Sequence, residues 1–217
     1  HPTHAGAAFR VWAPEARSVH VVLDSASHGS LDLALSQDAS GYFVGETPHA
    51  RTGDRYRYRV DGGDPRPDPA SRFQPEGVHG PSEIVDPGAF AWNDADWRGI
   101  SMRDLIVYEI HVGTFTPTGD FNGVIDRLPY LKTLGVTAVE LMPVGDFPGQ
   151  RNWGYDGVSL FAPARCYGRP DDLRRLVDAA HRIGLAVLLD VVYNHLGPDG
   201  NYLRVFSPYY FSTRKKT

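Results

Sequence analysis

One segment constrains the architecture of this 217-residue chain more than any other, and it reads Leu185-Ala186-Val187-Leu188-Leu189-Asp190-Val191-Val192-Tyr193-Asn194-His195. From residue 185 to 192 it is apolar except for Asp190, which predicts a parallel strand buried on both faces. A carboxylate in such a strand is costly to bury unless it is paired or hydrogen-bonded. Asn194 and His195 follow just beyond the strand end, where ligands bind in parallel α/β folds. A single histidine is more often structural, but three polar residues at this rim favour a binding site.

The residues before this strand alternate between strand and helix patterns. A helix is expected that Asp171 or Asp172 caps at its N-terminus and that Gly184 ends. Its apolar residues share one stripe, namely Leu173, Leu176, Val177, Ala180 and Ile183. The short apolar run from 138 to 142 predicts a second strand.

An earlier helix and strand complete this pattern. Apolar residues between 124 and 134 predict a helix that Gly135 ends, and Pro129 inside it should kink or divide the helix. Residues 105–112 predict the first strand. Two βα units and a third strand can begin either a Rossmann-like sheet or a (β/α)₈ barrel. No Gly-x-Gly-x-x-Gly follows the first strand, which weakens the dinucleotide-binding alternative.

Two further polar clusters lie at the ends of the predicted strands. Glu109 and His111 alternate on one face of the first strand, either as a buried pair that fixes packing or as part of a site. The loop after the second strand reads Asn152-Trp153-Gly154-Tyr155-Asp156. Its two aromatic rings beside a carboxylate could stack on a sugar and bind its hydroxyls, or the rings could merely anchor the loop.

The first 90 residues have a different rhythm, typical of an antiparallel β-sandwich. Residues 9–12 and 19–23 are short apolar or β-branched runs, and 55–60 alternates strictly between arginine and an apolar or aromatic residue. A turn follows at 61–63, and 65–87 is rich in proline, glycine and aspartate. We therefore expect two domains, a β-sandwich over 1–95 and an α/β domain over 96–217.

Composition excludes several classes of protein. The net charge of −4 gives no basic footprint for nucleic acid. No run of about 18 apolar residues is present, so we expect no membrane span, and we see no signal-peptide pattern. Cys166 is the single cysteine, which excludes an internal disulfide and fits a reducing compartment. We expect a cytoplasmic protein.

Taken together, the clusters resemble the α-amylase family of glycoside hydrolases. Residues 190–195 resemble the first signature region of that family, at the end of barrel strand three. Residues 152–156 resemble the loop whose tyrosine and aspartate line the subsite for the attacked glucose. Phe9-Arg10-Val11-Trp12-Ala13-Pro14 is typical of the first strand of the carbohydrate-binding-type sandwich in glycogen-active members. The resemblance implies a multidomain fold, in which an antiparallel β-sandwich precedes the first strands and helices (strands 1–3) of a (β/α)₈ TIM barrel.

Within the family, the chain most resembles the maltooligosyltrehalose trehalohydrolases. The stretches that suggest this are 108–117, 139–144, 153–163 and 193–202. The resemblance implies a retaining hydrolase that cleaves the α-1,4 bond next to the terminal trehalose of maltooligosyltrehalose. Branching enzymes, debranching enzymes and a non-catalytic glucan-binding protein remain alternatives. Branching enzymes usually carry proline and a small residue where this chain has Tyr193 and Asn194, whereas debranching enzymes share Tyr-Asn-His.

The same resemblance implies roles for individual residues. Tyr155 would stack under the attacked glucose, Asp156 and Trp153 would help to bind it, and His195 would hydrogen-bond its 6-hydroxyl. Two residues would support the site, namely Asp190 and Asn194. The nucleophilic aspartate and the acid glutamate are expected beyond Thr217, so the 217 residues alone should be inactive. Three strands of a barrel would leave an open sheet edge and an uncovered core, so we also expect poor solubility. We expect no cofactor and no essential metal, and the partner should be maltooligosyltrehalose or a related α-glucan.

Overall fold

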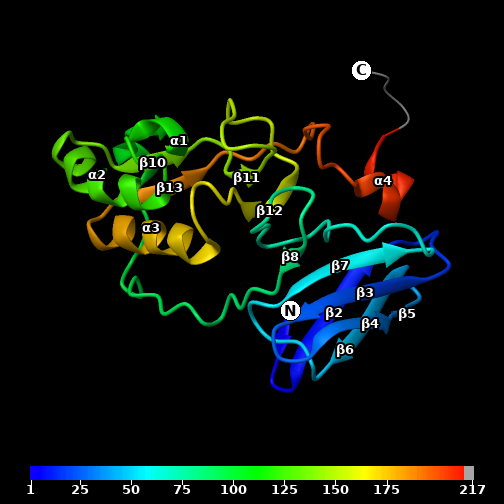
Figure 1. The fold of residues 1–217 in the computed structure, drawn as a ribbon. Helices are drawn as coiled ribbons and strands as arrows, with labels where there is room; N and C mark the ends of the chain where they lie inside the picture. The colour runs from blue at the N-terminus through cyan, green and yellow to red at the C-terminus, as the bar shows by residue number, and fades with distance from the viewer. Residues whose placement is uncertain (213–217) are drawn as a thin grey trace. The chain divides into compact units, whose positions relative to one another are not determined.

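The computed structural model describes residues 1–212, which form two compact units (Figure 1). Of the described residues, the first unit contains 1–86 and 198–212, and the second contains 87–197. These units differ from the expected domains, 1–95 and 96–217, because the segment after residue 197 packs into the first unit. The last five residues of the expected second domain lie outside the described residues.

The first unit contains two antiparallel four-stranded sheets, which enclose one apolar core. One sheet has the order β1-β2-β6-β5, with strands Pro2–Thr3, Gly6–Trp12, Tyr42–Thr47 and Ser36–Gln37. The other has the order β4-β3-β7-β8, with strands Gly29–Ala34, Val19–Ser25, Arg55–Val60 and Ser82–Glu83. The alternation in β7 is confirmed, because Tyr56 and Tyr58 point into the core while the arginines between them stay half-exposed. The predicted antiparallel β architecture is therefore present.

The segment after residue 197 completes this core. It forms the short helix α4 (Leu203–Phe206) and the 3₁₀ turn η2 (Pro208–Tyr210). The ring of Phe206 is 2% exposed and meets Tyr58 edge-on, with ring centroids 6.3 Å apart. The hydroxyl of Tyr202 lies 2.6 Å from Nδ1 of His79, which attaches the segment to the loop before β8.

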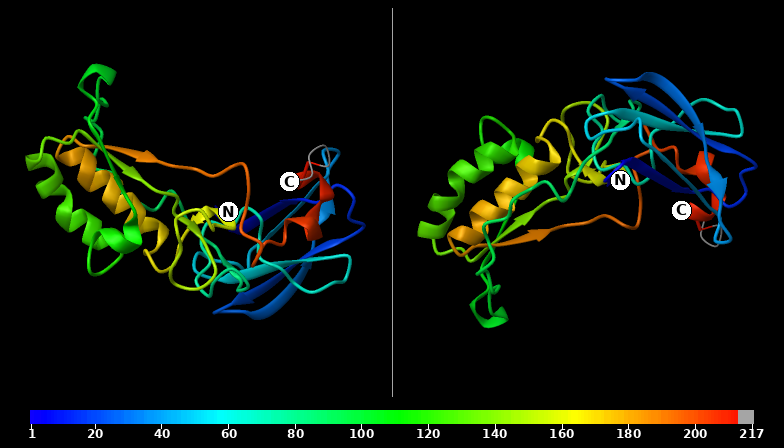
Figure 2. Two further views of the ribbon diagram at one scale, coloured as in Figure 1. Left: turned by 90° about the horizontal axis from the view of Figure 1, so that it is seen from above. Right: turned by 90° about the horizontal axis from the view of Figure 1, so that it is seen from below.

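The second unit is built on a parallel three-stranded sheet with the order β13-β10-β9. Its strands are Ala186–Leu189, Ala138–Leu141 and Val107–Ile110. Helices α2 (Phe121–Thr133) and α3 (Pro170–Arg182) run side by side and cover one face of the sheet (Figures 1 and 2). The predicted order of strands and helices is confirmed for this unit. The short 3₁₀ turn η1 (Met102–Asp104) precedes β9, and α1 (Val112–Phe115) follows it.

The helices differ from the prediction in two details. Pro129 does not divide α2, which is continuous from 121 to 133. Pro129 is solvent-exposed, so the carbonyl that loses its helical partner there can bind water. The N-cap of helix α3 is Arg169, two or three residues before the expected caps Asp171 and Asp172. Asp172 still contributes, because its carboxylate accepts a 2.6 Å hydrogen bond from the backbone N–H of Arg169. As predicted, Gly135 and Gly184 follow the helix ends, with φ of +92° and +73°.

The predicted burial of the third strand on both faces is wrong for this chain. Leu188 is 39% exposed and Leu189 is 48% exposed. Strand β13 is an edge strand, and α2 and α3 cover a single face of its sheet. Glu109 on β9 is likewise exposed, so it forms no buried pair with His111. The strands therefore have the composition of a fully covered sheet, whereas residues 1–212 cover them only in part.

A long connection joins β10 to α3 and carries the predicted sugar-binding loop. It contains a two-stranded antiparallel ribbon, β11 (Gly145–Asp146) and β12 (Ser159–Pro163), which the sequence did not predict. Residues 147–158 form the loop between these strands. None of the helices within residues 1–212 is both long and apolar enough to cross a bilayer.

Candidate functional site

The predicted site residues meet where the parallel strands end. The hydroxyl of Tyr155 donates a 3.0 Å hydrogen bond to Oδ2 of Asp190, the residue directly after β13. Nε2 of His195 lies 3.1 Å from the carbonyl oxygen of Tyr155. A carbonyl can only accept, so Nε2 carries the proton in this contact and a neutral His195 keeps Nδ1 as an acceptor. Tyr155 is thus held at its hydroxyl and at its backbone by the segment that follows β13.

The surroundings of Tyr155 are acidic. The hydrogen bond to Asp190 and the negative charge of that carboxylate raise the pKa of Tyr155, and the charges of Glu109 and Glu140 raise it further. These two glutamates are direct neighbours in the parallel register of β9 and β10. Because its pKa is raised, the Tyr155 phenol stays protonated and acts as a donor to Asp190.

The remaining predicted residues surround this contact. Trp153 is 87% exposed, and its backbone N–H lies 3.3 Å from Oδ2 of Asp156, so the aspartate closes the turn between the two aromatic residues. The ring of Tyr155 is 41% exposed. Asn194 is exposed, and the structure does not bring its side chain into these hydrogen bonds. Its predicted bracing role and the predicted sugar contacts stay predictions.

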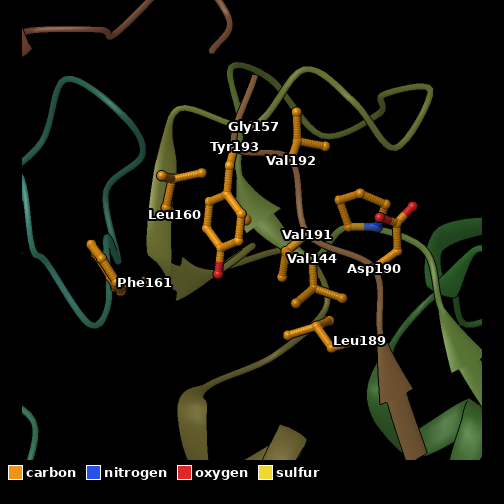
Figure 3. Close-up of a pocket in the computed structure, with 11 residues that line it drawn as sticks. Val144, Gly157, Leu160, Phe161, Leu189, Asp190, Val191, Val192 and Tyr193 are labelled. Atoms are coloured by element: carbon orange, nitrogen blue, oxygen red, sulfur yellow. The ribbon is translucent and has the colours of Figure 1, made fainter. Parts of the chain in front are cut away.

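A mostly apolar cavity of about 240 Å³, which was not predicted from the sequence, lies beside the same strand end. Figure 3 shows that Leu189, Val191 and Tyr193 point to one side of the chain, while Asp190 and Val192 point to the other. Leu160 and Phe161 complete the wall of the cavity. Asp190 and Val192 also line it, so the cavity adjoins the residue that accepts the hydrogen bond of Tyr155.

Three side chains under the loop form a second hydrogen-bonded group, which the sequence did not reveal. Nε2 of His111 lies 3.2 Å from Oδ1 of Asn152, and the hydroxyl of Tyr167 donates to the same oxygen over 3.2 Å. Burial raises the pKa of Tyr167, so its hydroxyl stays a donor. Nδ1 of His111 and Nδ2 of Asn152 are buried and have no hydrogen-bond partner within residues 1–212. A buried group left without a partner costs about 1–3 kcal/mol.

An ion pair holds the root of the loop. The carboxylate of Asp146 is fully buried and accepts from Nη1 of Arg165 at 2.9 and 3.2 Å. The same guanidinium donates to the carbonyl oxygens of Phe147 and Gly149, at 3.2 and 2.6 Å. Burial raises the pKa of Asp146, and the charge of Arg165 opposes that shift. The loop is therefore fixed at its root by Arg165, in its middle by Asn152 and at its tip by Tyr155.

The part of the chain that the structure describes contains no group of three or more His, Cys, Asp or Glu side chains able to hold a metal ion. The expectation of no essential metal stays a prediction for the whole protein. Within this chain, the site can bind and orient a polar ligand through two aromatic faces, a carboxylate and an imidazole.

Comparison with protein families matches both units. Residues 85–209 match the family model of the alpha amylase catalytic domain. Residues 1–87 match that of carbohydrate-binding module 48, the isoamylase N-terminal domain.

Individual relatives extend this similarity over nearly the whole chain. It is 52% identical over 213 residues to the malto-oligosyltrehalose trehalohydrolase of Deinococcus radiodurans, covering 98% of this chain and 34% of the relative. It is 50% identical to the enzyme of the same name from Saccharolobus solfataricus, covering 98% and 37%. A crystal structure of a putative alpha amylase from Salmonella typhimurium is 41% identical, with a TM-score of 0.89 over 100% of this chain and 38% of that protein. The chain thus spans about a third of the length of the curated relatives it matches.

Proposed function

Because this chain belongs to the α-amylase family of glycoside hydrolases, we propose that the full-length protein containing it cleaves the α-1,4 bond next to the terminal trehalose of maltooligosyltrehalose and releases trehalose. The family match covers residues 85–209, and the two trehalohydrolases named above are half identical to the chain over nearly all of it. We also propose that β9, β10 and β13 are the first three strands of a (β/α)₈ barrel. Their uncovered apolar side chains support this, since a closed barrel would bury them.

The observation that carries the proposal is the contact of Tyr155 with both Asp190 and His195. It lies at the C-terminal ends of parallel strands, the edge at which barrel enzymes bind their substrates. A retaining hydrolase also needs a nucleophilic carboxylate and an acid about 5–5.5 Å apart. We propose that both come from the protein beyond residue 217. The residues described here then position the sugar.

The geometry assigns a separate task to each positioning side chain. The half-exposed ring of Tyr155 offers a face to the attacked glucose. The hydrogen bond from its hydroxyl to Asp190 restrains the ring, and the contact of His195 with its carbonyl oxygen holds its backbone. Trp153 offers a second, almost fully exposed ring. His195 uses Nε2 internally, so its contact with a sugar hydroxyl would go through Nδ1 as an acceptor. Aromatic faces combined with a few fixed polar atoms suit an α-glucan.

Product analysis tests this proposal. The full-length protein is incubated with maltooligosyltrehalose and, separately, with a branched α-glucan, and the products are separated by chromatography. We expect trehalose from the first substrate. Tyr155→Ala should lose most of this activity, whereas Tyr130→Ala, at an exposed tyrosine on α2, should keep it. Linear oligosaccharides from the branched glucan without any trehalose would instead indicate a debranching enzyme.

The expected cytoplasmic location remains part of the proposal. Fractionation of the source cells, with antibody detection of the full-length protein, would test it.

A further inference from the structure

The hydrogen-bonded group of His111, Asn152 and Tyr167 lies outside the roles given above. We propose that these three residues form a clamp that sets the position of the loop carrying Trp153 and Tyr155. They are positioning residues, because none of them needs to touch the sugar. The proposal rests on the proposed function only where activity is measured, since the order of the loop can be measured without a substrate.

Two members of the clamp are fixed by their own backbones. The carbonyl of His111 accepts the N–H groups of Thr114 and Phe115 at the start of α1, each at 3.0 Å. Tyr167 accepts the N–H of Phe121 over 2.9 Å, and its ring is 3% exposed. Their donor atoms therefore approach Asn152 from a rigid frame. The third member, Asn152, belongs to the loop itself and is the part that the frame holds.

The packing around the clamp leaves little room for movement. A Cβ atom at Gly113 would lie 3.0 Å from a ring carbon of Tyr167 and 3.1 Å from one of His111. A Cβ atom at Gly154 would lie 2.8 Å from Cε of Met142. Gly154 also has φ of +101°, a backbone conformation that favours glycine. The loop thus turns at Gly154, between its two aromatic residues and two positions after the clamped Asn152.

Stability alone does not explain the clamp. Two of its nitrogen atoms, Nδ1 of His111 and Nδ2 of Asn152, are buried without a partner within residues 1–212. Apolar side chains of similar size would avoid this penalty. Nε2 of His111 and the hydroxyl of Tyr167 both reach one oxygen, Oδ1 of Asn152, and they lie 3.5 Å from each other. That arrangement fixes the direction of a side chain, which is what a substrate-positioning loop requires.

Pairs of variants separate the hydrogen bonds from simple packing. His111→Leu removes the donor to Asn152, whereas His111→Gln keeps an amide N–H near the position of Nε2. Tyr167→Phe removes only the second donor. Tyr130→Phe is the matched control, because Tyr130 is exposed on α2 and far in sequence from the loop. All variants are made in the full-length protein.

The order of the loop is read out by limited trypsin digestion. Arg151 is exposed directly before Asn152, so cleavage at this bond reports how often the loop opens. A neutral hydrogen bond contributes enough to change such an equilibrium about threefold to tenfold. We expect His111→Leu and Tyr167→Phe to be cleaved after Arg151 faster by about this factor, as measured by mass spectrometry. His111→Gln should lie near the wild type, and Tyr130→Phe should match it.

Steady-state kinetics on maltooligosyltrehalose provide the second readout. The variants with faster cleavage should lose a similar factor in kcat/KM per folded molecule, and His111→Gln should restore most of it. Wild-type cleavage rates in both His111→Leu and Tyr167→Phe would overturn the clamp. Equal effects of His111→Leu and His111→Gln would also overturn it, since packing would then explain the result. An inactive wild type would refute the proposed function alone, because trypsin cleavage would still decide on the clamp.

Discussion

Replacing Arg165 by methionine should loosen the root of the loop 147–158 more than any surface change of the same kind. The variant keeps most of the apolar stem but leaves the fully buried carboxylate of Asp146 without its counter-ion. Removing one partner of a buried pair costs about 3–5 kcal/mol. The matched control is Arg175→Met, since Arg175 is itself exposed and its partner Asp172 keeps the hydrogen bond from the N–H of Arg169. A surface pair of this kind contributes about 0.2–1 kcal/mol.

Hydrogen exchange in the full-length protein measures the difference locally. The amide of Val158 donates to the carbonyl oxygen of Asp146 over 2.9 Å and therefore reports opening at the loop root. A loss of about 3–5 kcal/mol corresponds to exchange faster by roughly two to four orders of magnitude, up to the limit set by global unfolding. Arg175→Met should change this amide by less than about fivefold.

The pH dependence provides an independent check of the same reasoning. Burial already raises the pKa of Asp146, and removing the positive charge of Arg165 should raise it further. A carboxyl whose pKa is higher in the folded state than in the unfolded state loses stability as the pH rises through that folded value. The penalty in Arg165→Met should therefore be larger at pH 8 than at pH 5. Exchange at Val158 within threefold of the wild type, or a penalty that grows on acidification, would refute the reasoning.

Four further predictions concern other parts of the protein. The buried carboxylate of Asp178 accepts the N–H of Asn93, in the linker before β9, over 2.6 Å. Asp178→Ala should therefore lower the free energy of opening at this linker by about 1.5–3 kcal/mol, as measured by hydrogen exchange of the Asn93 amide. The hydrogen bond from Arg59 lowers the pKa of Asp32, so this ion pair stabilises the fold above pH 3.8 and loses that effect as the pH falls further. Asp32→Asn should therefore lower the melting temperature at pH 6, and the difference from the wild type should shrink below pH 4. Tyr155→Phe should keep its ring but lose a hydrogen bond to a charged group, which should lower kcat/KM about tenfold to a hundredfold. Treatment with EDTA should leave the activity of the full-length protein unchanged.

Each of these predictions has a result that would contradict it. Unchanged exchange in Asp178→Ala would show that the linker is held by other contacts. A melting difference for Asp32→Asn that persists unchanged in acid would exclude the ion-pair explanation. A Tyr155→Phe enzyme with full kcat/KM would remove the hydroxyl from the positioning scheme. Activity lost to EDTA and restored by calcium would show that the protein needs a metal.

The elements that the sequence predicted well are those with an unbroken periodic pattern. The alternation in β7 and the apolar stripes of α2 and α3 located these elements closely. Strands β4 and β6 were missed, because glycine and polar residues interrupt their patterns. The ribbon of β11 and β12 was missed because β11 has only two residues. Its position depends on the contact of Asp146 with Arg165, and local sequence patterns do not report such distant pairs.

The residues of the candidate site were likewise predicted only in part. Tyr155, Asp190 and His195 could be grouped in advance, because the ends of parallel strands converge at one edge of a sheet. Tyr167 could not be found, because it lies 56 residues from His111 and its own neighbourhood carries no recognisable motif. The cavity beside β13 was also unpredictable, since its apolar walls look like ordinary core residues.

The burial of Phe206 has a practical consequence for anyone who wishes to remove the β-sandwich. Phe206 packs into the core of the first unit although it follows the whole second unit, residues 87–197, in the sequence. Deleting residues 1–86 would leave Phe206 and Tyr202 exposed to water, with their packing partners gone. The sandwich therefore cannot be removed by a simple N-terminal truncation. Its core is formed by two separate segments of the chain, and the protein that remains after deletion of the first segment should expose apolar surface and aggregate.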